Sequence, residues 1–161
     1  MSDQPVKIAI QQEQFDTQAE TEFLVKNSPN AGALVSFSGI CRADDTLSAL
    51  ELEHYPGMAE TQIQKIVEEA LGKWPIQGAL VIHRVGKIAV GETIVLVAVT
   101  STHRHAAFDG ANFIMDFLKS RAPFWKKEHL AKGGEGSWID AKESDEDALS
   151  RWGQDADTPG A

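Results

Sequence analysis

The order of apolar and polar residues along the chain predicts an interleaved set of strands and helices. Alternation with a period of two, or a short apolar run, predicts strands at residues 6–10, 32–38, 50–54, 80–84 and 92–100. Apolar residues at helical spacing predict three helices, which begin at Asp16 or Thr17, after Pro56-Gly57, and after a Ser101-Thr102 cap. We also expect residues 32–38 to form a well-buried strand, Gly72 to end the second helix, and Val85-Gly86 to form a turn. These elements follow no regular βαβ order, which favours an α+β fold over a doubly wound sheet.

The segment 115–128 carries the clearest chemical signal in this pattern. Large apolar residues are interleaved there with four cations, Lys119, Arg121, Lys126 and Lys127. Pro123 disfavours a helical conformation at the residue before it, so the helix that carries Lys119 must end near this point. Lys119 and Lys126 then lie on two elements joined by a tight corner. Such a corner lets two ammonium groups face one pocket from two directions.

A chain of 161 residues can form one hydrophobic core and is too short for two comfortable domains. We therefore predict a single domain over residues 1–152, in which residues 124–126 and 137–139 pair as strands, and a disordered tail over residues 153–161. No apolar run approaches the roughly 20 residues that span a bilayer, and the first residues lack the features of a signal peptide. A cytoplasmic location without membrane contact is the default expectation.

Charge narrows the class of partner. The net charge of −9 argues against nucleic acid, because duplex binding uses a broad basic surface. Positive charge is nevertheless concentrated locally: between His103 and Lys127, five Arg or Lys residues accompany two acids. A cationic cluster beside aromatic residues in an acidic protein predicts a site for a small anion.

Five basic residues are candidates for this site, each with a plainer alternative. His103 and Arg104 follow the longest apolar strand and open a helix, where anions bind readily, although a solvated helix start has the same sequence. Arg42 is either an anion ligand or a loop arginine. Lys119 and Lys126 are either partly desolvated functional amines or, respectively, a last-turn lysine and an edge-strand lysine.

Cys41 is the only cysteine, so neither an internal disulfide nor a cysteine-based zinc site can form. Beside Arg42 it can be interpreted as an activated thiolate, but a lone cysteine is more often a small buried hydrophobe. The five histidines follow no metal-binding spacing, and we predict no metal site.

Several segments together resemble the large, catalytic subunit of molybdopterin synthase, in order and with similar gaps over roughly residues 5–152. The matching segments are 37–42, 52–58, 82–86, 99–104, 113–119, 121–128, and Trp138 with 141–144. No single motif among them is decisive, but the ordered set is very specific.

The resemblance implies a sulfurtransferase of molybdenum-cofactor biosynthesis. In this family the substrate is a cyclic pyranopterin monophosphate (precursor Z), and the product, molybdopterin, carries a dithiolene. Sulfur arrives on a small ubiquitin-like subunit whose C-terminal Gly-Gly ends in a thiocarboxylate, so no resident cofactor is expected. The family fold is of the α/β hammerhead type, with a mixed, mainly antiparallel sheet and flanking helices. The large subunits form a homodimer within a heterotetramer.

Position by position, Lys119 and Lys126 match the family's active-site lysines, and Arg42, His103 and Arg104 match its phosphate contacts. The matching binding segments also contain Ile40, Cys41 (where the family more often has valine), Lys127 and Glu128. We expect the five basic residues to surround one hollow. Two alternatives stay open: a non-catalytic module that binds the tail of a ubiquitin-like partner, and a Schiff-base lysine enzyme that acts alone on a phosphorylated carbonyl compound.

Overall fold

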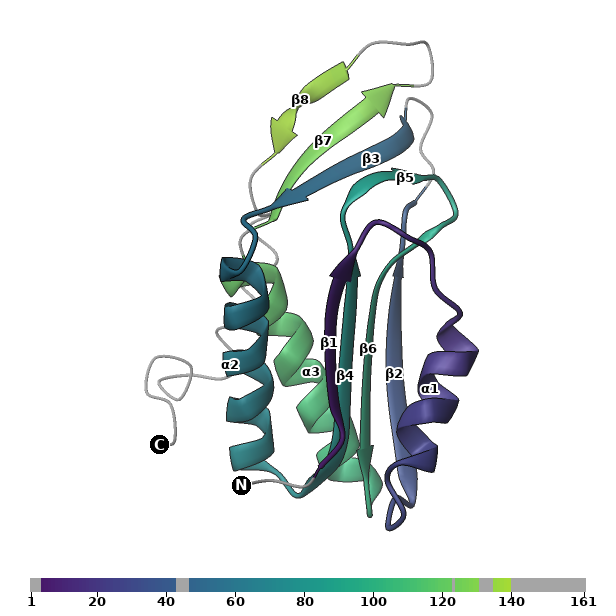
Figure 1. The fold of residues 1–161 in the computed structure, drawn as a ribbon, viewed down its shortest axis with the longest axis vertical. Coiled ribbons are helices and arrows are strands. Elements are labelled where there is room, and N and C mark those ends of the chain that lie inside the picture. Colours follow the sequence, from purple (N-terminus) through teal and green to yellow (C-terminus); the bar gives the residue numbers. More distant parts are fainter. Residues whose placement is uncertain (1–3, 43–46, 123, 131–134, 140–161) are drawn as a thin grey trace.

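The computed structural model describes residues 4–42, 47–122, 124–130 and 135–139. These residues form two four-stranded sheets and three helices (Figure 1). The first sheet, in the order β1-β4-β6-β2, consists of β1 (Val6–Gln11), β4 (Ile76–Arg84), β6 (Thr93–Ser101) and β2 (Ala33–Ile40). The second sheet, in the order β5-β3-β7-β8, consists of β5 (Gly86–Ala89), β3 (Leu47–His54), β7 (Phe124–Leu130) and β8 (Glu135–Ile139). The helices are α1 (Thr17–Lys26), α2 (Met58–Lys73) and α3 (Arg104–Arg121).

The first sheet has helices on both faces. Helices α2 and α3 cover one face and α1 the other (Figure 1). Its central strands β4 and β6 are therefore buried on both sides, which explains why they are apolar almost throughout. Strands β1 and β4 are parallel and the other described pairs are antiparallel. The predicted α+β fold with a mixed, mainly antiparallel sheet is confirmed.

The second sheet lies across the end of the first at which β4 ends and β6 begins (Figure 1). The chain passes from β4 through Val85 directly into β5, and Gly86 adopts a φ of 80° at this turn, a conformation that favours glycine. Cys41, Leu52 and Ile88 form a small apolar cluster between the sheets. The second sheet therefore covers this end of the first sheet, and we call the part of the molecule beneath it the roofed end.

The corner between α3 and β7 has the form that the sequence predicts. Helix α3 ends at Arg121, and the Ala122 backbone N–H still bonds the Leu118 carbonyl. Strand β7 begins at Phe124, whose N–H bonds the Ala122 carbonyl. The predicted pairing of the two C-terminal strands is also confirmed, since β7 and β8 are antiparallel neighbours.

Two expectations about the strands were wrong. Strand β2, expected to be well buried, is an edge strand of the first sheet, with Leu34 40% and Phe37 43% exposed. The apolar side chains of β2 therefore lie at an uncovered edge of the sheet and not in its centre. Val85-Gly86, expected to be a plain turn, leads into the four-residue strand β5.

Two expected helix boundaries also differ. Helix α2 runs past Gly72 to Lys73, and the extended residue Trp74 caps it. The N-cap of α3 is His103 rather than Ser101 or Thr102, and Ser101 Oγ instead accepts a hydrogen bond from the His103 N–H. The predicted tail, residues 153–161, lies outside the described residues. In the described part of the chain, no helix combines the length and apolarity needed to cross a bilayer.

Candidate active site at the corner of α3 and β7

Strand β7 divides its side chains between two faces of the second sheet. In the register with β3, Lys126 lies opposite Leu52, and Phe124 lies opposite His54. Directly opposite residues point to the same face, and Leu52 is 2% exposed in the cluster between the sheets. Lys126 and Phe124 therefore point inward, toward the end of the first sheet. Lys127 alternates with Lys126 and points to the other face.

Lys119 reaches the same region from the helix. It lies in the last turn of α3, half-buried, and its neighbour Leu118 belongs to the main core. The charges of Lys119 and Lys126 both act on His83, near the end of β4. The two lysines, from two elements, thus lie near enough to this buried ring for both charges to lower its pKa.

His83 was not singled out from the sequence, where it counted among the structural histidines. Its ring stacks on Phe124, with centroids 3.9 Å apart and planes 9° from parallel. Burial, followed by the charges of Lys119, Lys126 and His54, lowers the pKa of His83 to about 3. The one available signal in the sequence was a histidine near the end of an otherwise apolar strand.

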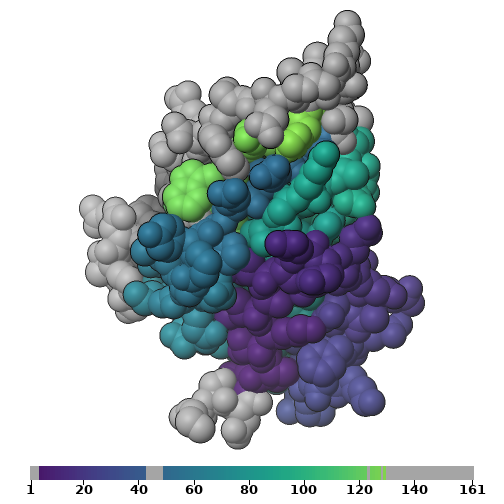
Figure 2. Space-filling model, turned by 45° about the horizontal axis from the view of Figure 1, so that its top comes forward, coloured from purple at the N-terminus to yellow at the C-terminus, as the bar shows by residue number. Residues whose placement is uncertain are grey.

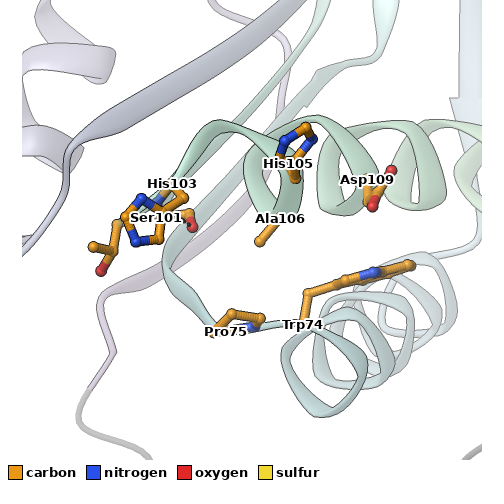
Figure 3. A pocket seen from close by; sticks show the side chains of 8 residues that line it. Trp74, Pro75, Ser101, His103, His105, Ala106 and Asp109 are labelled. Atoms are coloured by element: carbon orange, nitrogen blue, oxygen red, sulfur yellow. Dashed lines mark hydrogen bonds between the residues drawn. The ribbon is translucent and has the colours of Figure 1, made fainter.

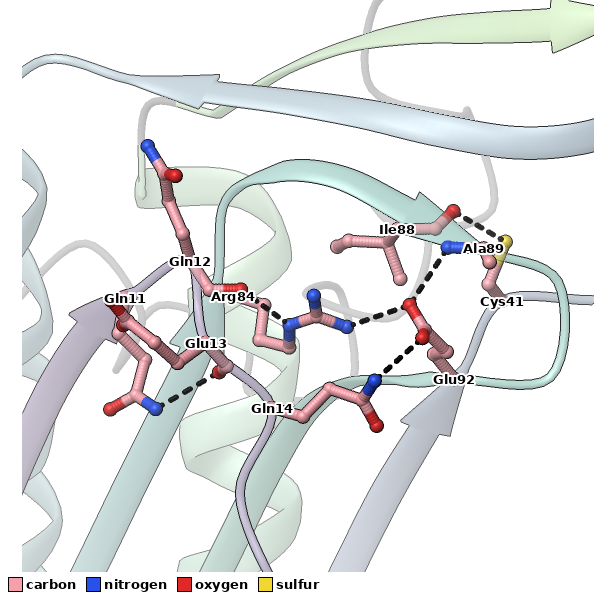
Figure 4. Close-up of polar contacts among 9 residues, drawn as sticks. All are labelled: Gln11, Gln12, Glu13, Gln14, Cys41, Arg84, Ile88, Ala89 and Glu92. Atoms are coloured by element: carbon pink, nitrogen blue, oxygen red, sulfur yellow. Dashed lines mark hydrogen bonds and ion pairs between the residues drawn. The ribbon is translucent and has the colours of Figure 1, made fainter.

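A partly buried ion pair between Arg84 and Glu92 links the segments next to the second sheet (Figure 4). Arg84 Nη1 donates to Glu92 Oε1 at 3.1 Å, and Arg84 Nε donates to the Gln12 carbonyl at 3.0 Å. Glu92 also accepts hydrogen bonds from the Ala89 N–H and the Gln14 amide. The Ala89 N–H, then Arg84, hold the pKa of the Glu92 carboxyl below its usual range. These bonds tie the segment after β1 to the turn between β5 and β6, two segments that are in contact on the surface in Figure 2.

Cys41 lies beside this network with its side chain in the core. It is 1% exposed, and its Sγ is 3.6 Å from the Ile88 carbonyl oxygen, to which it donates. Burial, and to a smaller extent the charge of Glu92, raises the pKa of the Cys41 thiol, which is accordingly protonated. Its neighbours Ile40 and Arg42 are exposed at the end of β2. The structure describes Glu128 only by its pairing with Leu50 in the sheet.

His103 and Arg104 lie at the opposite end of α3. Lys119 follows Arg104 by fifteen residues, so the helical rise of about 1.5 Å per residue separates their backbones by about 22 Å. No phosphorylated pterin spans this distance together with the lysines. The expectation that all five basic residues surround one hollow within a single chain is therefore wrong.

A cavity of about 530 Å³ adjoins the His103 end of α3. It is lined by Trp74, Pro75, Ser101, Thr102, His103, His105, Ala106 and Asp109. The Trp74 indole, from the end of α2, lies across the cavity from α3 (Figure 3). Among the described residues, no group of three His, Cys, Asp or Glu side chains is placed to hold a metal ion.

Comparison with known proteins identifies the family. Residues 10–121, more than half of the chain, match the family model described as MoaE protein. The chain belongs to the MoaE family. A relative from Mesorhizobium japonicum, named molybdopterin synthase catalytic subunit, is 58% identical over 146 residues, covering 90% of this chain and 92% of the relative. The resemblance read from the sequence is confirmed.

Solved MoaE-family structures share the fold. The MoaE protein from Burkholderia ambifaria superposes with a TM-score of 0.78 at 45% identity, covering 91% of this chain and 98% of its own. A structure titled as the complex of subunits 1 and 2 of the molybdopterin-converting factor from Helicobacter pylori superposes with a TM-score of 0.67 at 26% identity, covering 86% and 90%. The family members with solved structures thus include one in complex with a second subunit.

Proposed function

We propose that this chain is the catalytic subunit of a molybdopterin synthase. It moves sulfur from the thiocarboxylated C-terminus of a small ubiquitin-like carrier to precursor Z, a cyclic pyranopterin monophosphate. The observation that carries the proposal is the approach of Lys119 and Lys126, from α3 and β7, to the ring of His83. Family membership and the names of the relatives support the reaction, and the two-subunit complex supports the carrier as partner.

The two lysines suit both reactants, because the thiocarboxylate and the phosphorylated pterin are anions. Each transfer forms a bond between sulfur and a pterin side-chain carbon, and the oxygen substituent of that carbon leaves, protonated as water or still attached to the phosphate. The bond between sulfur and the carrier's acyl carbon then breaks. That carbon takes a hydroxyl group from water and leaves as a carboxylate. Lys119 has the central role, stabilising the oxyanion that precedes this product, and Lys126 orients the anion and assists proton transfer.

Placing both reactants beside one pair of cations also lowers the entropic part of the barrier, by up to roughly 7–11 kcal/mol in well-oriented reactions. The sulfur is cargo brought by the carrier, so the proposal requires no resident cofactor and no metal. The buried, protonated Cys41 thiol has no step in it, in agreement with a sequence of events in which the carrier alone supplies sulfur.

One chain supplies only part of this site, and we propose that a second copy completes it. Strand β2 is the edge of the first sheet, and it runs from Ala33, opposite Ser101, to Ile40, opposite Thr93. When two β2 edges face each other across a two-fold axis, the Ile40 end of each copy meets the Ser101 end of the other. The His103 end of one α3 then approaches the lysine corner of the partner copy.

Exposed apolar side chains support this homodimer. Leu34 and Phe37 are 40% and 43% exposed on β2, and Phe108 is 54% exposed on the helix beside it. Large apolar residues gathered on one side of a protein mark an interaction surface. With one carrier bound to each copy, the assembly is a heterotetramer.

Product formation tests the reaction. Incubation of the chain with thiocarboxylated carrier and precursor Z should yield dithiolene product in more than one turnover. Binding of the carrier without any product would show that the chain is a recognition module instead. Borohydride trapping of a phosphorylated carbonyl compound without the carrier would favour a Schiff-base enzyme.

Mixed dimers test the shared site. Lys119→Ala and Arg104→Ala chains, each weak alone at low precursor concentration, are refolded together. Random mixing makes half of the dimers mixed, each with one intact site of two, so roughly a quarter of the native activity should return. A mixture no more active than its components would mean that each copy uses its own His103 and Arg104.

A further inference from the structure

His83 is a buried polar residue to which the proposed reaction gives no task. It is 5% exposed, and its Nδ1 lies 2.8 Å from the Arg84 carbonyl oxygen. Because a carbonyl oxygen only accepts hydrogen bonds, Nδ1 carries the proton and donates it. In a neutral ring the other nitrogen, Nε2, is then an unprotonated acceptor.

The ring of His83 also packs against the residue at which β7 begins, next to the corner between α3 and β7. It stacks face to face on Phe124, the first residue of β7, at 3.9 Å. His54 lies 6.3 Å from Phe124, so its ring also neighbours this aromatic side chain. Phe124 precedes Lys126 by two residues on the inward face of the strand, and Lys119 precedes Phe124 by five. The contact between His83 and Phe124 therefore holds the start of the strand that carries Lys126.

Burial and neighbouring positive charges determine the protonation state of the His83 ring. Three groups on three elements repel a proton from it, Lys119 on α3, Lys126 on β7 and His54 on β3, and burial adds to their effect. The ring is therefore neutral at neutral pH. A neutral acceptor interacts favourably with both ammonium groups, whereas an imidazolium would repel them.

We propose that His83 is a positioning residue for Lys119 and Lys126. Its face holds Phe124 at the start of β7, and its Nε2 edge accepts hydrogen bonding from the ammonium groups, which keeps two like charges together. The inference rests on the proposed function for its consequence in catalysis, but its structural content is independent of turnover. The plain alternative is a core histidine that only fills space.

Two substitutions separate these roles. His83→Phe keeps a flat ring against Phe124 and removes both nitrogens, and His83→Gln returns an acceptor near the position of Nε2. In single-turnover sulfur transfer we expect His83→Phe to lower the rate constant about tenfold or more while the apparent affinity for precursor Z stays within about twofold. His83→Gln should recover most of that loss. His129→Phe, which removes a hydrogen bond between β7 and β3, is the matched control for His83→Phe and should retain the native rate constant.

Nuclear magnetic resonance tests the contact without any substrate. In ¹⁵N-histidine-labelled protein, the His83 ring should be the Nδ1–H tautomer, and its Nε2 resonance should move in Lys119→Met or Lys126→Met. Lys73→Met, in the last turn of α2, should leave it unchanged. These variants retain His83, so the measurement stands even where a His83 variant does not fold.

The outcomes are distinct. A His83→Phe chain with the native rate constant, or a His83 Nε2 resonance unmoved by both lysine substitutions, would overturn the positioning role. A native chain that makes no product would instead overturn the proposed function, and the resonance would still decide the role of His83.

Discussion

The two ends of α3 carry the same kind of chemistry in opposite surroundings. At the C-terminal end, Lys119 is half-buried under the second sheet and near a neutral buried ring. At the N-terminal end, His103 and Arg104 are exposed beside an open cavity. A cation in a partly desolvated site interacts more strongly with developing charge than one in water. This difference is the basis for proposing that the roofed end performs the chemistry and that the open end binds the substrate.

The largest expected effect tests the roofed end. Lys119→Ala should lower the single-turnover rate constant of sulfur transfer by about 10²–10³-fold, the usual cost of one oxyanion-stabilising donor. Lys73→Ala, which changes a lysine in the last turn of another helix, α2, should leave the rate constant unchanged. A Lys119→Ala chain with nearly native rates would remove this residue from the mechanism.

The buried ring at the same end should make stability depend on pH. The folded pKa of His83, about 3, is below the unfolded value near 6.5, so the unfolded chain binds a proton there that the folded chain does not. The stabilisation is complete above pH 6.5 and is lost as pH falls toward 3, by at most about 1.4 kcal/mol per pH unit. Urea unfolding of native and His83→Gln chains between pH 7 and 4.5 measures the difference in slope. Parallel slopes would mean that the ring protonates freely in the folded state.

A substitution at the open end of α3 should affect KM more than kcat. In the proposed site Arg104 makes a charge-assisted contact to the phosphate, so Arg104→Ala should lower kcat/KM for precursor Z roughly 10–100-fold, mostly through KM. Steady-state kinetics with saturating carrier separates the two constants. A loss confined to kcat would place Arg104 next to the reacting atoms. It would contradict the proposal that one end of α3 performs the chemistry and the other binds the substrate. Asn112→Ala, exposed in the middle of α3 and outside the cavity, is the control for the helix.

The lysine corner was predictable because its causes are local. The helical periodicity before Lys119 and the backbone restriction imposed by Pro123 act within a few residues. The separation of Arg104 from Lys119 was also within reach, since a predicted helix between them sets the distance through its rise per residue. The predicted helix between Arg104 and Lys119 was therefore already inconsistent with a single hollow that contains both residues.

Other features depend on partners far away in the sequence. An apolar run such as β2 has the same sequence pattern whether the strand lies at the edge or in the centre of a sheet. Only the strand order shows that β2 is an edge strand with Phe37 exposed. The opposite directions of Lys126 and Lys127 follow from alternation, but which of them points inward follows from the register with Leu52. His83 acquires its role from Phe124, forty-one residues later, and no local pattern announces that contact.

The smallest expected effect concerns an ion pair at the roofed end. Arg121 Nη1 lies 2.9 Å and 3.1 Å from the two carboxylate oxygens of Glu69, and this pair joins the last residue of α3 to α2. Arg121 also lies over the Phe117 ring at 4.2 Å, so replacing Arg121 would remove packing as well as charge. Glu69→Gln isolates the charge and should lower the free energy of unfolding by less than about 1 kcal/mol, because the pair is partly exposed.

Urea unfolding at low and high salt measures this contribution. The difference between native and Glu69→Gln chains should shrink at 1 M NaCl, where the Debye length is about 3 Å. Glu68→Gln, exposed one residue earlier on α2, is the matched control and should be nearly neutral at both salt concentrations. A salt-independent loss above about 2 kcal/mol would show that this pair behaves as a buried one. The roofed end of α3 would then depend on charge pairing between helices as well as on the second sheet above it.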